Sequence, residues 1–212
     1  DCIARIERDN PSLNAIVATC FERARHEARL AEVASIRSAP QGLLHGLPVA
    51  IKDLTETAGL TTTFGSPRFR DHVPGQDENV VAAIRAHGGI VLGKTNTPEF
   101  GIGGNTNNRV YGPTRNPFDP DLTCGGSSGG SAVAVATAMV PLATGTDSGG
   151  SLRNPASFCG VVGFRPTPGL IASERRPQGW SPMGVHGPMA RSVGDAGLLL
   201  QAMAGHDPCD PI

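Results

Sequence analysis

Apolar residues in this chain follow two different spacings, which predict strands and helices in turn. An apolar, β-prone run over 13–20 predicts the first strand, and the residues before it predict that the chain begins inside a helix. Residues spaced by three or four positions predict a helix directly after this strand, namely Phe21, Ala24, Ala28 and Ala31. A loop over 38–45 then leads to a second predicted strand over 47–54, which carries Lys52 within an apolar run.

The middle of the chain predicts two further helices with a buried strand between them. Asp77 is a candidate cap for a helix that stops at the glycine pair 88–89. The buried stripe of that helix comprises Val80, Val81 and Ile84. The short apolar run 89–93 predicts a strand. Thr97 as the N-cap and Pro98 at the first helical position predict the next helix.

A run of small residues predicts a central helix in the second half of the chain. Residues 131–139 have almost no polar face, so we expect this helix to be buried. A glycine-rich loop over 123–130 leads into it. Two strands are predicted after it, over 142–146 and 160–164.

The predicted strands and helices alternate to the end of the chain. The last helix starts with Ser192 and Asp195 in a pattern like a capping box, and it ends at Gly205. Its apolar stripe comprises Ala196, Leu199, Leu200 and Met203. Such alternation predicts an α/β fold, with a mixed β-sheet covered by helices on both faces. Without a repeat or a linker to divide it, the sequence 1–212 predicts a single domain.

Composition narrows the class of protein. The chain is 39% hydrophobic and 17% charged with a net charge of −1, so no basic field indicates direct nucleic-acid binding. No apolar run approaches the roughly 20 residues that span a bilayer, and no signal-peptide pattern is present. Five scattered cysteines without a C-x-x-C predict reduced thiols in a cytoplasmic protein. The six histidines include no i,i+4 pair, so we expect no metal site.

Glycine is the unusual component, at 28 of 212 residues, which is nearly twice the typical share of ~7%. The glycines cluster over 101–104, 125–130 and 145–150. Clustered glycine indicates backbone that approaches another group closely or adopts positive φ. We therefore expect the chemistry of the protein near these segments.

The sequence contains a literal match to one phosphate-binding motif and to one hydrolase motif. Residues 88–95 match the phosphate-binding pattern G-x-x-x-x-G-K-[ST], but they contain the predicted strand where that mechanism needs a loop of free amides. Residues 125–129 match the nucleophile elbow G-x-S-x-G, with Asp195 and His206 available downstream as partners. The elbow needs a strand directly before it, whereas 116–122 contains two prolines and predicts a loop. The first interpretation is rejected, and a His-dependent serine esterase is kept as a lesser alternative.

Three segments occur in an order that is more specific. They are the apolar strand with Lys52 over 49–53, the Gly/Ser block 125–131, and the block 145–153, which reads G-T-D-S-G-G-S-L-R. With the flanking segments 46–53, 62–66, 92–96, 158–167 and 187–191, this set resembles the amidase signature family over nearly the whole chain. Members of that family usually continue about as far again beyond a chain of this extent. The resemblance therefore implies the N-terminal, triad-bearing part of the family domain, without its C-terminal remainder.

The resemblance implies a serine–serine–lysine triad. Ser151 would be the nucleophile, Ser127 a bridging serine in a cis peptide after Gly126, and Lys52 the base. A lysine can act as a base only when neutral, so its pKa must fall from ~10.4 toward ~7–8, which requires burial without a carboxylate partner. The alternation of side chains along a strand places Asp53 on the face opposite Lys52.

Further roles follow from the same resemblance. Backbone N–H groups of Ser148, Gly149 and Gly150 would form the oxyanion hole, together with that of Ser151. Supporting roles fall to Ser128, which would hold the loop by hydrogen bonding, and to Asp147 and Arg153, which would brace it as a pair, with direct substrate contact by Arg153 as the alternative. The substrate pocket would be lined by the 101–104 segment, in particular Gly103 and Gly104.

Other chemically notable residues are expected to be structural. Cys159 lies in an apolar run and is predicted to belong to the core. His186 and His206 are expected at the surface or in structural contacts. Trp180 and Met183 are expected in packing, with substrate contact as the alternative.

The resemblance implies a hydrolase that cleaves a non-peptide carboxamide through an acyl-enzyme, without a metal or cofactor. Its expected partner is a small amide substrate, and a homodimer is compatible with the sequence. The first alternative is the glutamine-hydrolysing subunit of a tRNA-dependent amidotransferase, because such subunits share the triad blocks. An inactive assembly fragment is a further alternative.

Overall fold

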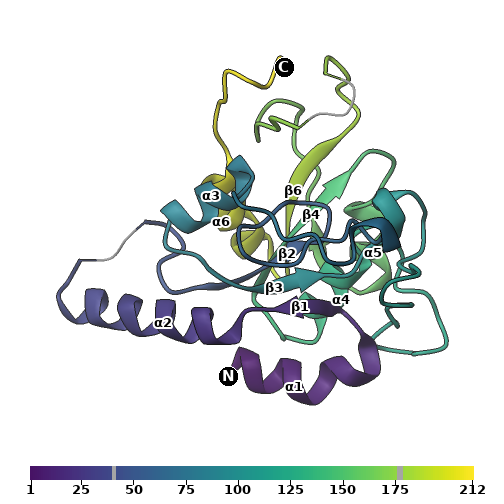
Figure 1. Ribbon diagram of the computed structural model, residues 1–212, viewed down its shortest axis with the longest axis horizontal. Coiled ribbons are helices and arrows are strands. Elements are labelled where there is room, and N and C mark those ends of the chain that lie inside the picture. Colours follow the sequence, from purple (N-terminus) through teal and green to yellow (C-terminus); the bar gives the residue numbers. More distant parts are fainter. Residues whose placement is uncertain (40–41, 176–178) are drawn as a thin grey trace.

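Six strands form one mixed sheet in the order β1-β3-β2-β4-β6-β5. The computed structural model describes residues 1–39, 42–175 and 179–212 (Figure 1). The three central strands are parallel, and the outer strands β1, β6 and β5 pair antiparallel. The strands are β1 Ile16–Thr19, β2 Pro48–Lys52, β3 Ile90–Thr95, β4 Leu142–Asp147, β5 Val162–Gly163 and β6 Val185–Ala190. The predicted α/β class with a mixed sheet is confirmed.

Helices pack on both faces of this sheet. They are α1 Cys2–Leu13, α2 Phe21–Ile36, α3 Asn79–Ala86, α4 Gly129–Ala136, α5 Arg153–Phe158 and α6 Val193–Met203, with the short 3₁₀ turns η1 Pro67–Phe69 and η2 Glu99–Gly101. One core cluster joins α1, α4 and α5 to the sheet, and a second joins α3 and α6 to the opposite face. Across the described part of the chain, none of the helices is both long and apolar enough to cross a bilayer.

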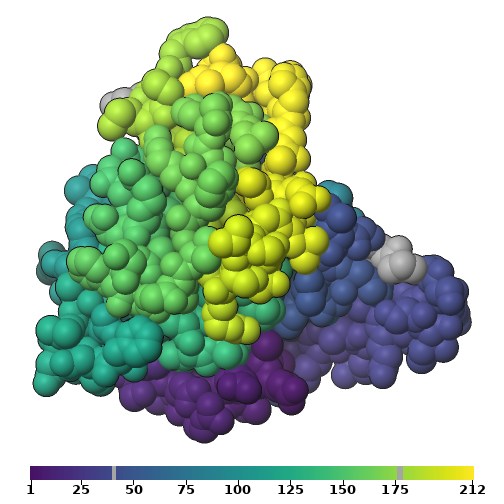
Figure 2. Space-filling model, turned by 180° about the vertical axis from the view of Figure 1, so that it is seen from behind, coloured from purple at the N-terminus to yellow at the C-terminus, as the bar shows by residue number. Residues whose placement is uncertain are grey.

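Two outer segments frame this body. Helix α2 projects from it in both views, and only Ala24 of α2 is buried (Figures 1 and 2). Figure 2 shows the C-terminal segment, in yellow, along the molecular surface on the far side of the view in Figure 1. The expected loop after α2 is present where it is described, and residues 40 and 41 of that prediction lie outside the described residues.

The alternation of side chains along β2 sets the direction of Lys52. Val49 and Ile51 belong to the cluster under α3 and α6, whereas Ala50 belongs to the cluster under α4. Lys52 follows Ala50 by two positions, so its side chain points toward the N-terminal end of α4. Gly130 in α4 lets that helix approach β3, because a Cβ there would lie 2.3 Å from the backbone N of Asn96.

The predicted helix boundaries are correct at α6 and wrong at two other places. The Ser192 Oγ accepts a hydrogen bond from the Asp195 N–H at 3.1 Å, as the capping pattern predicts. Helix α3 follows Glu78 rather than Asp77, because the Asp77 carboxylate accepts the Ala58 N–H at 2.7 Å instead. The helix predicted from Thr97 is reduced to η2, where positive φ angles at positions 100 and 101 end the turn.

Strand β6 was not predicted from the hydrophobic pattern. It contains Gly187 and Pro188, two residues that are rare in strands, yet it pairs with β4 along its whole length. Gly187 is required by close packing, since a Cβ there would lie 2.3 Å from the carbonyl oxygen of Phe164. Tertiary contact therefore overrides local propensity at this strand.

Candidate active site

The end of β2 places a lysine in a cage of hydroxyl groups. The Lys52 side chain is fully buried. Its Nζ lies within hydrogen-bond distance of three hydroxyl oxygens, Ser127 Oγ at 2.7 Å, Ser128 Oγ at 2.8 Å and Thr146 Oγ1 at 2.8 Å. These hydroxyls are neutral and come from the segment before α4 and from β4. The arrangement holds an amine in place without pairing it to a carboxylate.

Burial dominates the electrostatics of this lysine. Desolvation lowers the pKa of Lys52 well below its usual value, and the negative charge of Asp147 opposes this only in part. Asp53 lies on the opposite face, as the strand alternation predicts, where its Oδ2 accepts the Thr63 hydroxyl at 2.6 Å. The neighbouring cation of Asp53 is Lys94, with Nζ and Oδ1 3.8 Å apart. The neutral amine needed for a base is therefore favoured at Lys52.

Lys94 is a second buried lysine and lies within β3, not at the start of a helix. Its Nζ donates to Thr62 Oγ1 at 2.8 Å and to the carbonyl of Thr55. These contacts tie β3 to the segment that follows β2. The strand position of Lys94 agrees with the rejection of a phosphate-binding loop.

The serine block before α4 has an unusual backbone. The peptide bond between Gly126 and Ser127 is cis, as the resemblance implies. Ser128 connects this block to the next one, because its N–H donates to the carbonyl of Ser151 at 3.2 Å. Its hydroxyl accepts the Thr146 N–H and donates to the Thr146 carbonyl, both at 3.2 Å. Ser128 thus has the contacts expected of a residue that supports the loop.

Ser151 lies in the turn between β4 and α5 and is half-buried. Its carbonyl is held by Ser128, but among the described residues its hydroxyl has no hydrogen-bond partner. The Ser127–Ser151 hydrogen bond that the resemblance implies is therefore not formed in this structure. The segment 116–122 before the serine block contains no strand, which disfavours a nucleophile elbow at Ser127.

A buried carboxylate organises the turn that carries Ser151. Arg153 Nε lies 3.0 Å from Asp147 Oδ2, so the expected pair is formed. Arg165 is an additional partner that the sequence did not single out, and its guanidinium lies 3.1 Å from Asp147 Oδ1. Burial alone would raise the pKa of Asp147, but hydrogen bonds from Arg153 and from two backbone N–H groups outweigh it and hold the pKa at about 2.

One of the predicted oxyanion donors has a different role. The Gly150 N–H donates to Asp147 Oδ1 at 2.8 Å, so it points into the turn and not toward a substrate. The N–H groups of Ser148, Gly149 and Ser151 have no hydrogen-bond partner within the described chain. The donors open to a substrate in this turn are therefore those three.

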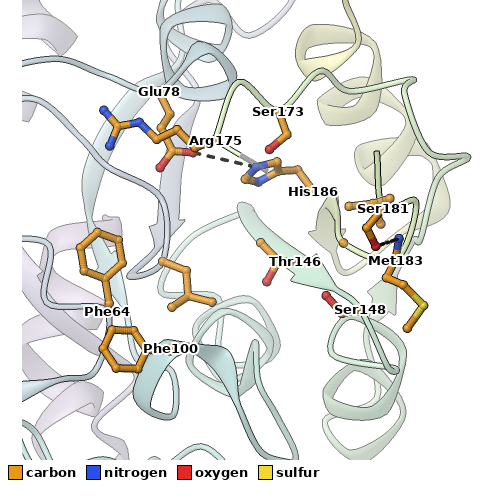
Figure 3. A pocket seen from close by; sticks show the side chains of 13 residues that line it. Phe64, Glu78, Phe100, Thr146, Ser148, Ser173, Arg175, Ser181, Met183 and His186 are labelled. Atoms are coloured by element: carbon orange, nitrogen blue, oxygen red, sulfur yellow. Dashed lines mark hydrogen bonds and ion pairs between the residues drawn. The ribbon is translucent and has the colours of Figure 1, made fainter. Parts of the chain in front are cut away.

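A pocket of about 620 Å³ opens beside the lysine cage (Figure 3). Thr146 and Ser148 lie at its base, so the pocket reaches both the cage and the Ser151 turn. Gly103 and Gly104 are not among the residues that line this pocket, whereas Phe100, just before the 101–104 segment, does line it. Gly101 lies next to the lysine cage, since a Cβ there would be 3.5 Å from Ser127 Oγ.

Two residues that the sequence assigned mainly to structural roles belong to the pocket wall. Met183 and His186 line the pocket, and Glu78 lies opposite His186. Residue spacing carries no signal for His186, because β6, which contains it, was not predicted. Cys159, in contrast, is fully buried in the core as expected, and burial raises the pKa of its thiol to about 12.

Comparison with known proteins gives one consistent result. The family model described as Amidase matches residues 1–212. An acylamidase from Rhodococcus erythropolis is 45% identical over 212 residues, which is 99% of this chain and 44% of that protein. A glutamyl-tRNA(Gln) amidotransferase subunit from Anaeromyxobacter dehalogenans (strain 2CP-C) is 44% identical over 208 residues, which is 98% of this chain and 42% of that protein.

Solved structures agree with the sequence relatives. A bacterial aryl acylamidase, described as belonging to the amidase signature enzymes, superimposes with a TM-score of 0.93 at 38% identity. The match covers 99% of this chain and 44% of that one. The chain thus spans less than half the length of the relatives that it matches.

Proposed function

Because this chain belongs to the amidase signature family, we propose that it provides the groups that hydrolyse a linear carboxamide, with Ser151 as nucleophile. The observation that carries the proposal is the contact of 2.7 Å between Lys52 Nζ and Ser127 Oγ inside a buried cage of hydroxyls. A neutral amine in contact with a serine supplies the adjacent general base that a serine nucleophile needs. Ser151 lies one hydrogen bond away from this cage, through Ser128.

The proton follows a path through the two serines. Neutral Lys52 accepts the proton of Ser127, and Ser127 accepts the proton of Ser151 as its Oγ attacks the carbonyl carbon. A rotation of the half-buried Ser151 side chain toward Ser127 completes this path when substrate binds. The tetrahedral intermediate then loses the amine, which takes a proton from Ser127 while Lys52 returns its proton to Ser127. Water attacks the resulting ester by the same path and releases the acid.

The turn after β4 stabilises the negative charge of the intermediate. The N–H groups of Ser148, Gly149 and Ser151 are its candidate donors, because Gly150 is engaged by Asp147. One such donor is worth about 3 kcal/mol in the transition state. Asp147 holds the shape of this turn through Arg153 and Arg165, so its contribution is to position the donors.

Glutamine hydrolysis within an amidotransferase is the second candidate function. Its support is the 44% identity to glutamyl-tRNA(Gln) amidotransferase subunits over 98% of this chain, which is nearly the same as the identity to the acylamidase. Both functions use the same cage and the same nucleophile, so the cage does not separate them. The acceptor of the released ammonia and the rest of the pocket distinguish them.

Turnover of matched amides tests the proposal. The purified protein is incubated with a panel of aliphatic amides, aryl amides and glutamine, and released ammonia or amine is measured. Turnover that disappears in Ser151→Ala supports the proposal, with Ser157→Ala as a control because Ser157 is an exposed serine of α5. Turnover that persists in Ser151→Ala contradicts it, and a preference for glutamine supports the amidotransferase alternative.

A further inference from the structure

The pocket beside the cage has one apolar side and one acidic side. Phe64 and Phe100 form the apolar side, and Glu78 and His186 face it from the other (Figure 3). Glu78 immediately precedes α3, and His186 comes from β6, so two distant segments meet at this wall. Glu78 is only 5% exposed. A carboxylate with so little access to water requires an explanation.

The two oxygens of Glu78 have different surroundings. Its Oε1 accepts the N–H of Glu56 at 2.7 Å. Its Oε2 lies 3.9 Å from Nε2 of His186, which is too far for a hydrogen bond. No side chain of the described residues donates a hydrogen bond to Oε2. One oxygen of a nearly buried carboxylate therefore faces the pocket without a donor.

The nearby cations are engaged elsewhere. Arg175 lines the same pocket, but its guanidinium pairs with the carboxylate of Glu56. Lys94 is bound by Thr62 and lies near Asp53. Neither cation contacts Glu78 directly, so the charge of this carboxylate is not cancelled by a partner within the described chain. Burial accordingly raises the pKa of Glu78 to about 7.

The acidic wall lies close to the groups that would perform the reaction. His186 pairs with Thr146 across the β4–β6 ladder, and Thr146 binds Lys52 Nζ at 2.8 Å. Residues paired in this way project from the same face of a sheet. A ligand whose reacting carbonyl lies at Thr146 and Ser148 therefore needs only a short chain to reach His186 and Glu78.

We propose that Glu78, next to His186, binds a protonated amino group that the amide substrate carries at the end remote from its reacting carbonyl. An ammonium group supplies the donor that Glu78 Oε2 lacks and offsets the cost of burying the carboxylate. Methylene groups between the ammonium and the carbonyl pack against Phe64 and Phe100. The preferred substrate class is thus a short amino amide. This inference rests on the proposed amidase function for the position of the reacting carbonyl.

A pair of isosteric ligands tests the inference by binding alone. Pentanamide is compared with the amide in which an amino group replaces its terminal methyl group, and dissociation constants are measured by calorimetry near pH 8. We expect the amino amide to bind at least about tenfold more tightly, and Glu78→Gln to abolish this preference. Glu32→Gln, on the exposed surface of α2, removes the same charge and is expected to leave the preference unchanged.

The outcomes separate this inference from the function on which it rests. Glutamine keeps an acceptor for the Glu56 N–H, and equal unfolding midpoints of the two variants show that the pocket is intact. Equal binding of both amides by the native protein overturns the inference. So does a Glu78→Gln variant that keeps the preference, or that weakens both amides equally. If the native protein shows the binding preference but hydrolyses neither amide, the proposed function is contradicted and the ammonium site is still supported.

Discussion

Lys52 Nζ and Ser127 Oγ lie 2.7 Å apart although 75 residues separate them in the chain. The contact forms because the C-terminal end of β2 lies next to the loop that precedes α4. Helix α4 consists of small residues, which allow it to pack closely on the sheet. The same helix is fully buried from Gly129 to Val135. A buried helix of the core thus fixes Lys52 relative to Ser127.

The rate of amide hydrolysis is expected to depend on the protonation of Lys52. Burial lowers its pKa well below the ordinary value, and only the neutral amine accepts a proton. The value of kcat/KM should therefore fall about tenfold per pH unit below this lowered pKa. This fall is measured as the pH profile of kcat/KM. A profile that rises only around the ordinary lysine pKa of ~10.4 would contradict the role of Lys52 as base.

Asp147 is expected to stabilise the protein above strongly acidic pH. Its pKa is depressed from 3.8 to about 2, so its contribution is complete above pH 3.8 and is lost as pH falls through about 2. The shift corresponds to about 2 kcal/mol. Asp147→Asn should lower the free energy of unfolding at neutral pH by about that amount, measured by urea unfolding. Because the Ser151 turn loosens, kcat should fall as well.

A matched outcome distinguishes these two effects of Asp147. If Asp147→Asn unfolds at the same urea concentration as the native protein at neutral pH, the depressed pKa has no energetic consequence. If stability falls but kcat per folded molecule stays unchanged, the carboxylate does not position the turn.

Glu78→Gln is expected to become more stable relative to the native protein as pH rises. The folded-state pKa of Glu78 is raised by burial from 4.5 to about 7, so the unfolded chain releases this proton first and stability falls between those values. The variant lacks this titration and should gain up to about 3 kcal/mol between about pH 5 and pH 8. Urea unfolding of Glu78→Gln and Glu32→Gln at both pH values checks it. Among the described residues, the charged and titratable groups facing Glu78 are Glu56, Glu174, Arg175, Lys94 and His186.

Two glycine substitutions, one in α4 and one in α6, are expected to change the stability of the protein in opposite directions. A Cβ at Gly130 would lie 2.3 Å from a backbone nitrogen, so Gly130→Ala should destabilise the protein by about 2–3 kcal/mol. Gly197 in α6 has no atom within 4 Å of such a Cβ, and Gly197→Ala should stabilise it by about 0.5–1 kcal/mol. Thermal unfolding compares them. An unchanged midpoint for Gly130→Ala would show that the α4 packing is looser than described.

Local pattern was sufficient to predict the central elements. The apolar run of β2, the buried small-residue helix α4 and the capped α6 depend on residues close in sequence, and all three are present. The opposite directions of Lys52 and Asp53 follow from strand alternation alone. The class of fold followed from the order of these elements.

What was missed depends on contacts between distant segments. The local sequence of β6 does not predict a strand, because it contains Gly187 and Pro188. Its pairing with β4 determines its structure. The third hydroxyl around Lys52 comes from Thr146 on that neighbouring strand, and the pocket wall joins Glu78 to His186. The use of the Gly150 N–H by Asp147 is likewise a property of the folded turn. None of these pairings has a signature in spacing.

The central claim is that Ser151 is a nucleophile activated by Lys52. Labelling of the purified protein with a fluorophosphonate, followed by mass-spectrometric mapping of the modified residue, tests it most directly. We expect the label on Ser151, and at least about a hundredfold slower labelling in Lys52→Met at an unchanged fold. A label on Ser127, or equally fast labelling of Ser151 in Lys52→Met, would contradict the claim.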